Sequence, residues 1–265
     1  MDTKLTDLLQ ILKTLESAVL AYSGGVDSTF LLKAIQLSGL KALAVTAVSD
    51  IIPERDVQNA QTMAEEIGID HVFIETDELS FEKFVTNPPE RCYYCKDMLF
   101  RKLSERSRNQ GYLHVIDGST IDDLTDYRPG RKAAREHNIR SPLIEAGLSK
   151  ANVRELSRHL NLSTWNKPSA SCLATRFPYG HRITREALRR VAKAEDFLKS
   201  IGFETVRVRD HGYLARIEIN EDSLELLLSP ETRKHVSEAL KTLGYAFISL
   251  DLEGYRSGSM NVLIR

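Results

Sequence analysis

A glycine-containing turn between an apolar run and a helical pattern constrains this chain most strongly. Ala18–Tyr22 has the composition and length of a buried strand, Ser23-Gly24-Gly25-Val26-Asp27-Ser28 follows it directly, and a helical pattern then runs to Leu37. Glycines allow a tight turn, and exposed N–H groups at the start of a helix attract anions. The segment therefore predicts a phosphate-binding turn; a strand–helix turn that merely requires glycines is the alternative.

The alternation of strands and helices continues through the first 165 residues. Further strand-like runs lie at Leu43–Val48, His71–Glu75 and His114–Asp117, and helical patterns lie at Val26–Leu37, Pro53–Ile67 and about Tyr93–Asn109. This spacing indicates βαβ units and an α/β fold with a parallel sheet between helices. Ligands bind such sheets at the carboxyl ends of the strands, so the site is expected in the loops there.

After Cys172 the pattern changes. A helix is predicted at Thr184–Ser200, two strands within Thr205–Ile219, a helix at Pro230–Leu243 and a last strand at Ala246–Leu252. These elements indicate a smaller C-terminal α+β domain. The predicted boundaries are 1–165 for the nucleotide domain, 166–181 for a cysteine-bearing connector and 182–265 for the second domain.

Composition narrows the class of protein. The 36 basic and 37 acidic residues give a net charge of −1, which provides no global field for nucleic acid, so no nucleic-acid partner is favoured. The amphipathic start is unlike a signal peptide and no apolar run is long enough to cross a membrane, so we expect a globular cytoplasmic protein. The single tryptophan, Trp165, is expected to pack in the core.

The side chains of the turn suit a nucleotide–metal complex. Ser23 and Ser28 can donate hydroxyl protons to phosphate oxygens, and Asp27 can hold Mg²⁺. The lysine of a Walker A loop is missing, which argues against transfer of a terminal phosphoryl group.

These residues resemble the PP-loop of the ATP pyrophosphatases, which have an adenine nucleotide α-hydrolase-like fold. The resemblance implies that Ser23, Gly24, Gly25, Asp27 and Ser28 bind ATP. It also implies transfer of the adenylyl group to a carboxylate or carbonyl oxygen, after which ammonia or sulfur displaces AMP.

Three cysteines bear on the choice of nucleophile. Cys92 and Cys95 form a C-x-x-C pair one helical turn apart, and Cys172 follows in the connector. Four interpretations are open. They are a redox disulfide, a zinc site, buried structural thiols, and a [4Fe–4S] cluster with one open iron. For the zinc site, spacing identifies no fourth ligand among His71, His114 and His137. The cluster is favoured because it could carry hydrosulfide to an adenylylated substrate.

A longer resemblance covers nearly the whole chain and is to the LarE family, ATP-dependent sulfur transferases of nickel-pincer nucleotide cofactor synthesis. The matching segments are Asp126–Gly130 (DYRPG), Trp165–Cys172 (WNKPSASC), Arg176–Gly180 (RFPYG), Val206–Arg209 (VRVR) and Gly254–Asn261 (GYRSGSMN). The family implies pyridinium-3,5-biscarboxylic acid mononucleotide as substrate and a homo-oligomer.

The resemblance leaves the source of sulfur open. In one branch a single cysteine, at the place of Cys172, surrenders its own sulfur and becomes dehydroalanine. Because Cys92 and Cys95 are also present, this chain resembles the three-cysteine branch, in which a [4Fe–4S] cluster carries sulfide from a cellular donor. Cys92, Cys95, Cys172 and Asp27 are therefore the predicted catalytic residues.

Arginines are expected to bind the anionic substrate. Arg207 and Arg209 alternate along an apolar strand and so share a face, and guanidinium groups suit bidentate binding of carboxylate and phosphate. Arg128 and Arg256 lie in other matched segments and are predicted to complete the site. For each arginine the alternative is a solvated surface charge.

Several carboxylates are weaker candidates. By resemblance, Glu195 and Glu218 are predicted to bind a divalent cation or to orient the arginines, with a plain surface position as the alternative. Asp122, Asp123 and Asp126 follow a strand and are predicted either to assist Mg²⁺ or to form a turn.

Three other functions share some of these features. A tRNA thiolation enzyme also combines a PP-loop with three cysteines, but its usual zinc ribbons or RNA-binding domain are missing. An ammonia-using synthetase would have no role for the cysteines. A non-catalytic nucleotide sensor or iron–sulfur carrier would release no pyrophosphate.

Overall fold

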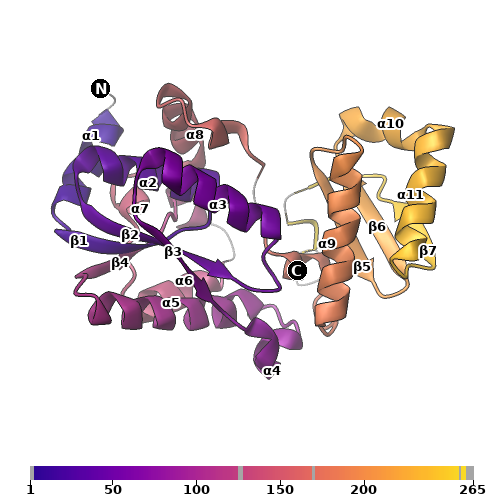
Figure 1. The fold of residues 1–265 in the computed structure, drawn as a ribbon, viewed down its shortest axis with the longest axis horizontal. Coiled ribbons are helices and arrows are strands. Elements are labelled where there is room, and N and C mark those ends of the chain that lie inside the picture. The colour runs from indigo at the N-terminus through magenta and orange to yellow at the C-terminus, as the bar shows by residue number, and fades with distance from the viewer. Residues whose placement is uncertain (1–2, 125–127, 169–170, 257, 261–265) are drawn as a thin grey trace. The chain divides into compact units, whose positions relative to one another are not determined.

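The computed structural model describes residues 3–124, 128–168, 171–256 and 258–260. The chain forms two compact units (Figure 1). The N-terminal unit contains the described residues of Met1–Glu78 and Glu90–Ala170, and the C-terminal unit those of Leu79–Pro89 and Ser171–Arg265. No helix in the described parts of the chain is long and apolar enough to cross a membrane.

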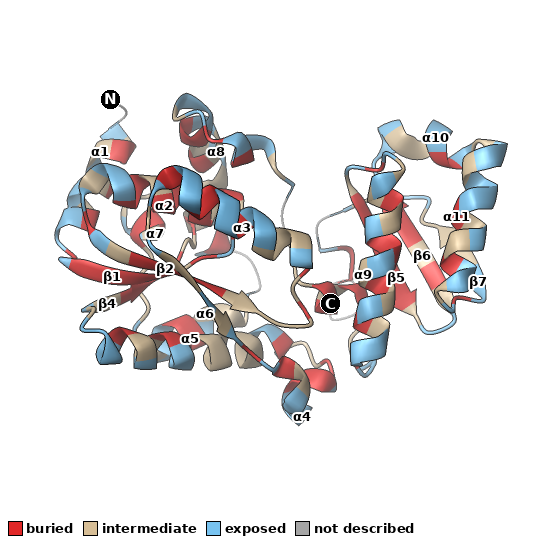
Figure 2. Cartoon of the chain, viewed as in Figure 1, coloured by how far each residue is buried: buried red, intermediate tan, exposed pale blue. Residues whose placement is uncertain are grey.

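A parallel four-stranded sheet forms the centre of the N-terminal unit. The strand order is β3-β2-β1-β4. The strands are β1 Ser17–Ala21, β2 Lys41–Val48, β3 His71–Glu75 and β4 His114–Ile116. The pairing Val19↔Leu43 and Val19↔Val115 places β1 in the middle, where it is almost wholly buried (Figure 2). This arrangement confirms the predicted α/β fold with a parallel sheet.

Helices cover both faces of this sheet. One face packs against α1 Thr3–Lys13, α2 Val26–Ser38, α3 Glu54–Ile67, α7 Pro142–Glu145 and α8 Lys150–His159. The other face packs against α5 Arg91–Asn109 and α6 Gly130–Glu136. Each side has its own apolar core, with Phe30 in the first and Phe100 in the second, so the strands are buried on both faces as a parallel sheet requires.

The C-terminal unit has a three-stranded mixed sheet with the order β5-β6-β7. Its elements are α9 Arg185–Ser200, β5 Val206–His211, β6 Leu214–Ile219, α10 Leu224–Leu228, α11 Pro230–Thr242 and β7 Phe247–Leu250. β5 and β6 are antiparallel, and β6 and β7 are parallel. Apolar residues of α9 and α11 pack on one face of the sheet around Phe203, as an amphipathic pattern predicts.

A segment from the middle of the N-terminal half belongs to the C-terminal unit. It contains the short helix α4 Glu82–Val85 and the fully buried Asn87, whose side-chain amide donates to the carbonyl oxygens of Phe177 (3.3 Å) and Pro178 (2.7 Å). Asn87 has a positive φ of 54°. The predicted domain boundaries made no provision for this segment and stay a prediction.

Short 3₁₀ helices connect the main elements. They are η1 Glu78–Ser80, η2 Ile121–Leu124, η3 Ser163–Asn166, η4 Leu173–Arg176 and η5 Glu221–Ser223. Trp165 lies in η3 with 39% of its surface exposed, beside the Arg158 guanidinium at 5.9 Å from the ring centre. The expectation that Trp165 packs in the core is therefore wrong, because the aromatic ring covers a charged side chain instead.

Candidate functional site

The predicted phosphate turn joins β1 to α2. Gly24 has a φ of +66°, and a Cβ there would lie 2.8 Å from the Cα and Cβ of Ala60, so only glycine fits without strain. The hydroxyl oxygens of Ser23 and Ser28 lie 3.1 Å apart. Gly25 caps α2 with no side-chain hydrogen bond to the first turn within the described chain. The N–H groups there are thus available to an anion.

The loop after β4 lies against this turn. A Cβ on Gly118 would lie 3.1 Å from the Cα and N of Ser28, so the absence of a side chain permits the close approach. Gly118 was not predicted as a site residue. Its only signal in the sequence is its place two residues after the strand that ends at Ile116, which is where a parallel sheet binds its ligands.

Asp27 lies on the first turn of α2 in a charged surrounding. Burial, followed by the charge of Asp123, raises the pKa of Asp27 to about 6, while Lys150, Arg154 and Arg128 act in the opposite direction. The side chain is therefore mainly ionised at neutral pH and can offer oxygen to a hard cation such as Mg²⁺. That role of Asp27 stays a prediction.

Asp123 organises the basic residues of this site. Its Oδ1 lies 3.2 Å from Arg128 Nε and 3.0 Å from Lys150 Nζ, and its Oδ2 accepts from the Thr120 N–H at 3.0 Å. Burial alone would raise the pKa of Asp123, but the Thr120 N–H and the charges of Arg128 and Lys150 outweigh it and hold the pKa below its usual range. Lys150 was not predicted as a site residue. Asp126, predicted with Asp122 and Asp123, lies outside the described residues.

The C-x-x-C pair lies in the first two turns of α5, in the N-terminal unit. Cys92 is exposed, Cys95 is half-buried, and neither is in a disulfide. Cys95 Sγ lies 3.8 Å from Oε1 of the buried Glu78, which also accepts a hydrogen bond from Thr76 Oγ1 at 2.8 Å. Glu78 was not predicted, and no pattern in the sequence singles it out.

Cys172 belongs to the C-terminal unit and is half-buried. It precedes η4, and its carbonyl oxygen accepts from Thr175 Oγ1 at 2.8 Å and from Arg176 Nη1 at 3.2 Å. Within the described ranges no group of three or more His, Cys, Asp or Glu side chains is gathered to hold a metal. The cluster therefore stays a prediction based on the chemistry of three thiols.

Arg176 attaches this cysteine-bearing segment to α9. Its side chain is buried and binds Glu195 in a bidentate manner, with Nε to Oε1 at 2.7 Å and Nη2 to Oε2 at 2.9 Å. Burial would raise the pKa of Glu195, but the Arg176 guanidinium holds it below the usual range. Arg176 lies in the RFPYG segment, and the sequence predicted no structural role for it.

Arg207 and Arg209 lie on β5 and are both buried. Arg209 Nη2 donates to Glu218 Oε2 at 2.6 Å and to Ser259 Oγ at 2.9 Å, whereas Arg207 lies over the Tyr255 ring at 5.1 Å. Burial, followed by the charge of Arg176, lowers the pKa of Arg207. Because like charges gather here, a bound anion would be stabilised.

The remaining predicted residues are divided between the units. Glu195 and Glu218 are both completely buried and bound to arginines, so the alternative of a plain surface position is wrong. The geometry suits the orienting role, and the cation role stays a prediction. Arg256 is exposed and pairs with Glu253, and Arg128 lies in the N-terminal unit.

Comparison with known proteins gives three full-length relatives. A pyridinium-3,5-bisthiocarboxylic acid mononucleotide synthase from Lactiplantibacillus plantarum is 40% identical over 261 residues, which cover 98% of this chain and 94% of that protein. Uncharacterized proteins from Synechocystis sp. (42% over 262 residues, 98% of each chain) and Methanocaldococcus jannaschii (34% over 240 residues, 90% of each chain) are also similar. No family model matches the chain.

Proposed function

Because the chain belongs to the LarE-type family of pyridinium-3,5-bisthiocarboxylic acid mononucleotide synthases, we propose that it converts both carboxylates of pyridinium-3,5-biscarboxylic acid mononucleotide into thiocarboxylates with ATP. The observation that carries the proposal is 40% identity over 98% of the chain to a protein named for that product. Membership of this family confirms the prediction of a sulfurtransferase enzyme. The use of ATP and the source of sulfur are parts of the proposal.

The first half of the reaction takes place at the turn between β1 and α2. The backbone N–H groups and hydroxyls of Ser23–Ser28 hold the phosphates, and Asp27 holds the accompanying Mg²⁺. A substrate carboxylate oxygen attacks the α-phosphorus, an O–P bond forms, and pyrophosphate leaves as the bond from the α-phosphorus to the bridging oxygen breaks. Lys150 and Arg128 offset the negative charge around this centre, so catalysis depends on positioning and charge stabilisation.

In the second half, sulfur attacks the acyl carbon and the bond to the AMP oxygen breaks, leaving a thiocarboxylate. A [4Fe–4S] cluster ligated by Cys92, Cys95 and Cys172 would supply the sulfur as hydrosulfide, replenished by a cellular sulfide donor. The donor set fits such a group, since thiolates are its usual ligands and none of the three cysteines is in a disulfide or fully buried. Arg207, Arg209 and Arg256 bind the anionic groups of the substrate, and two rounds thiolate both carboxylates.

The proposal is tested with protein purified without oxygen and supplied with ATP, Mg²⁺, sulfide and the biscarboxylic acid mononucleotide. We expect AMP, pyrophosphate and the bisthiocarboxylic product in chromatography with mass detection, and more than one product per chain. AMP with less than one product per chain, together with loss of the elements of H₂S at residue 172, would favour sacrificial transfer from Cys172. No AMP with this substrate would refute the assignment. A homo-oligomer is also proposed and is measured by light scattering.

A further inference from the structure

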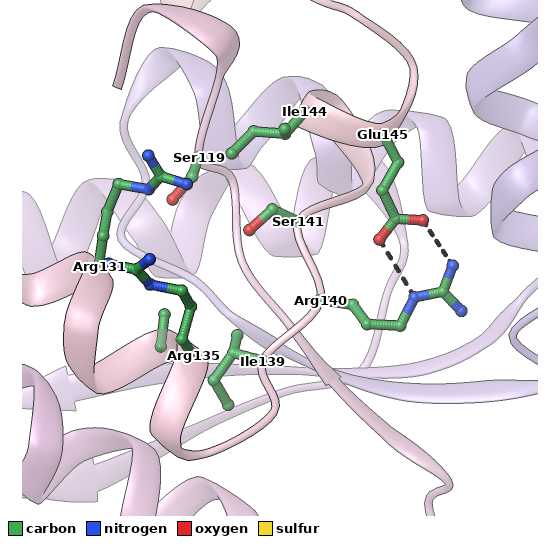
Figure 3. A pocket seen from close by; sticks show the side chains of 9 residues that line it. Ser119, Arg131, Arg135, Ile139, Arg140, Ser141, Ile144 and Glu145 are labelled. Atoms are coloured by element: carbon green, nitrogen blue, oxygen red, sulfur yellow. Dashed lines mark hydrogen bonds and ion pairs between the residues drawn. The ribbon is translucent and has the colours of Figure 1, made fainter. Parts of the chain in front are cut away.

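A pocket of about 240 Å³ lies in the N-terminal unit beside the edge strand β4 (Figure 3). Arg140 forms a parallel bridge with Ile116, so the chain between α6 and α7 runs along this edge and partly covers it. Ser119 also lines the pocket and directly follows Gly118, which contacts the phosphate turn at Ser28. The pocket is thus joined to the phosphate turn through Gly118, but none of the residues that line the pocket belongs to the turn.

The pocket carries an excess of positive charge. It is lined by three arginines and one glutamate, and the glutamate, Glu145, is engaged in a bidentate pair with Arg140 (3.1 and 2.5 Å). Arg131 donates to the backbone oxygen of Asp123 at 3.3 Å, and within the described chain it has no carboxylate partner. The Arg135 guanidinium has no hydrogen bond or ion pair with the described chain, whereas the backbone oxygen of Arg135 accepts from the Asn138 N–H at 3.1 Å. Two guanidinium groups without a carboxylate indicate an anion-binding site.

The two guanidinium groups project from α6 on the same side of the pocket. Figure 3 shows Arg131 extending toward Ser119, with Arg135 below it. Neighbouring like charges repel each other, and a dianion placed between them would remove that repulsion. Arginine forks bind phosphate oxygens in a bidentate manner, so two of them suit a phosphate group.

The remaining lining is not that of a simple anion site. Asp117 accepts hydrogen bonds from the hydroxyls of Ser141 (2.7 Å) and Ser119 (2.8 Å), so both protons are used and both oxygens remain as acceptors. Ala134, Ile139 and Ile144 add apolar surface. Acceptors and apolar contacts match a ligand that carries hydroxyl groups on a small organic body.

We propose that this pocket binds a small hydroxylated phosphate monoester, with the phosphate on Arg131 and Arg135 and a ligand hydroxyl on the serine oxygens. The assignment depends only on the lining residues and not on the reaction proposed above. Inorganic phosphate shares the anionic chemistry but lacks the groups that the serines and the apolar wall would contact.

Titration calorimetry of the full-length protein tests this, with ribose 5-phosphate, inorganic phosphate and ribose as probes. We expect ribose 5-phosphate to bind more tightly than inorganic phosphate, and ribose not to bind. The double variant Arg131→Gln/Arg135→Gln should weaken ribose 5-phosphate binding by about tenfold or more. Arg101→Gln/Arg108→Gln, which removes the same charge from exposed positions on α5, should leave binding unchanged. Should the first double variant unfold, the exposed Arg135→Gln alone gives the comparison.

Three results would overturn the proposal. If both double variants weaken the binding of ribose 5-phosphate equally, the effect comes from the net charge of the protein and not from this pocket. Loss of binding in Ser23→Ala, with the arginine variants unaffected, would place the phosphate on the turn between β1 and α2. If inorganic phosphate binds as tightly as ribose 5-phosphate, the pocket does not recognise the organic part of the ligand.

Discussion

Asp27 stands on the first turn of α2, where burial and the neighbouring Asp123 raise the pKa of its carboxyl to about 6. Between the pKa of an unfolded chain, near 3.9, and this value, the folded protein binds more protons than the unfolded one. The free energy of unfolding therefore falls as the pH rises through that interval. Above pH 6 it stays lower by the full amount, because Asp27 is then ionised in both states. The site retains a carboxylate that disfavours the folded state, which is expected of a residue selected for binding a cation.

Asp27→Asn should make the folded protein more stable while abolishing its activity. Removing the buried charge should raise the free energy of unfolding at pH 7 by about 1–3 kcal/mol, measured by urea denaturation. The same change should abolish AMP formation, because an amide is a poor ligand for Mg²⁺. Asp7→Asn, an equal change of charge at an exposed position on α1, should alter neither quantity. A destabilised Asp27→Asn protein would contradict the burial argument.

The pH dependence of AMP formation should follow the same group. Below about pH 6 the carboxyl of Asp27 is protonated and loses the cation, so kcat/KM for ATP should fall about tenfold per pH unit. Steady-state rates between pH 5 and 8 at Mg²⁺ below saturation would show this acid limb, because saturating metal would displace the proton from the carboxyl. A flat profile across pH 6 would exclude Asp27 as the controlling group.

Gly24→Ala should destabilise the turn by more than the strain of its positive φ alone accounts for. Its φ is positive and its Cβ would clash with Ala60, so we expect a loss of about 1–3 kcal/mol in unfolding free energy and a higher KM for ATP. Gly68→Ala is the matched control, since it has a similar φ of +79° and open space around the Cβ. Equal losses in the two variants would show that contact with Ala60 contributes nothing.

Among the elements, η4 is held to α9 by a buried ion pair rather than by apolar packing alone. Arg176 and Glu195 bring opposite charges together at 1% and 0% exposure. Removing one partner of such a pair leaves the other charged and buried, which costs more than the pair contributes. The segment that carries Cys172 thus depends on Arg176 for its position in the C-terminal unit.

Arg176→Ala should lower the free energy of unfolding by about 3–5 kcal/mol in urea denaturation. Arg182→Ala provides the control, because its ion pair with Glu82 is exposed to solvent and should leave the unfolding midpoint unchanged. An Arg176→Ala protein as stable as wild type would show that Glu195 is satisfied without the guanidinium.

On the scale of the whole molecule, the three cysteines are supplied by both compact units. Cys92 and Cys95 belong to the N-terminal unit and Cys172 to the C-terminal unit. The arginines proposed to bind anions are likewise divided, with Arg128 in one unit and Arg207 and Arg209 in the other. The proposed chemistry therefore requires both units, and neither alone contains the full set of predicted residues.

Replacing any one cysteine with alanine should remove most of the iron bound after anaerobic reconstitution, because each thiolate is a ligand of the proposed cluster. Iron and sulfide analysis with visible absorption spectra would measure this for Cys92→Ala, Cys95→Ala and Cys172→Ala. Ser104→Ala on α5 should retain the wild-type iron content. Full iron content in Cys172→Ala, or colourless wild-type protein, would contradict the cluster.

Local patterns were sufficient for the fold and for the turn. The four apolar runs of the first half became β1 to β4, and the turn after β1 has the backbone that its glycines predict, because side-chain periodicity and glycine geometry act over a few neighbouring residues. Full-length relatives then support the family that the longer motifs indicate.

Contacts between distant segments could not be read from those patterns. Gly118 lies on Ser28, Lys150 pairs with Asp123, Glu78 contacts Cys95, and Asn87 binds the Phe177–Pro178 backbone across 90 residues or more. Burial of Glu195 and exposure of Trp165 likewise reverse what residue type suggests. These features depend on which parts of the chain meet after folding, and only then do burial and neighbouring charge fix the pKa of Asp27 and the partners of each arginine.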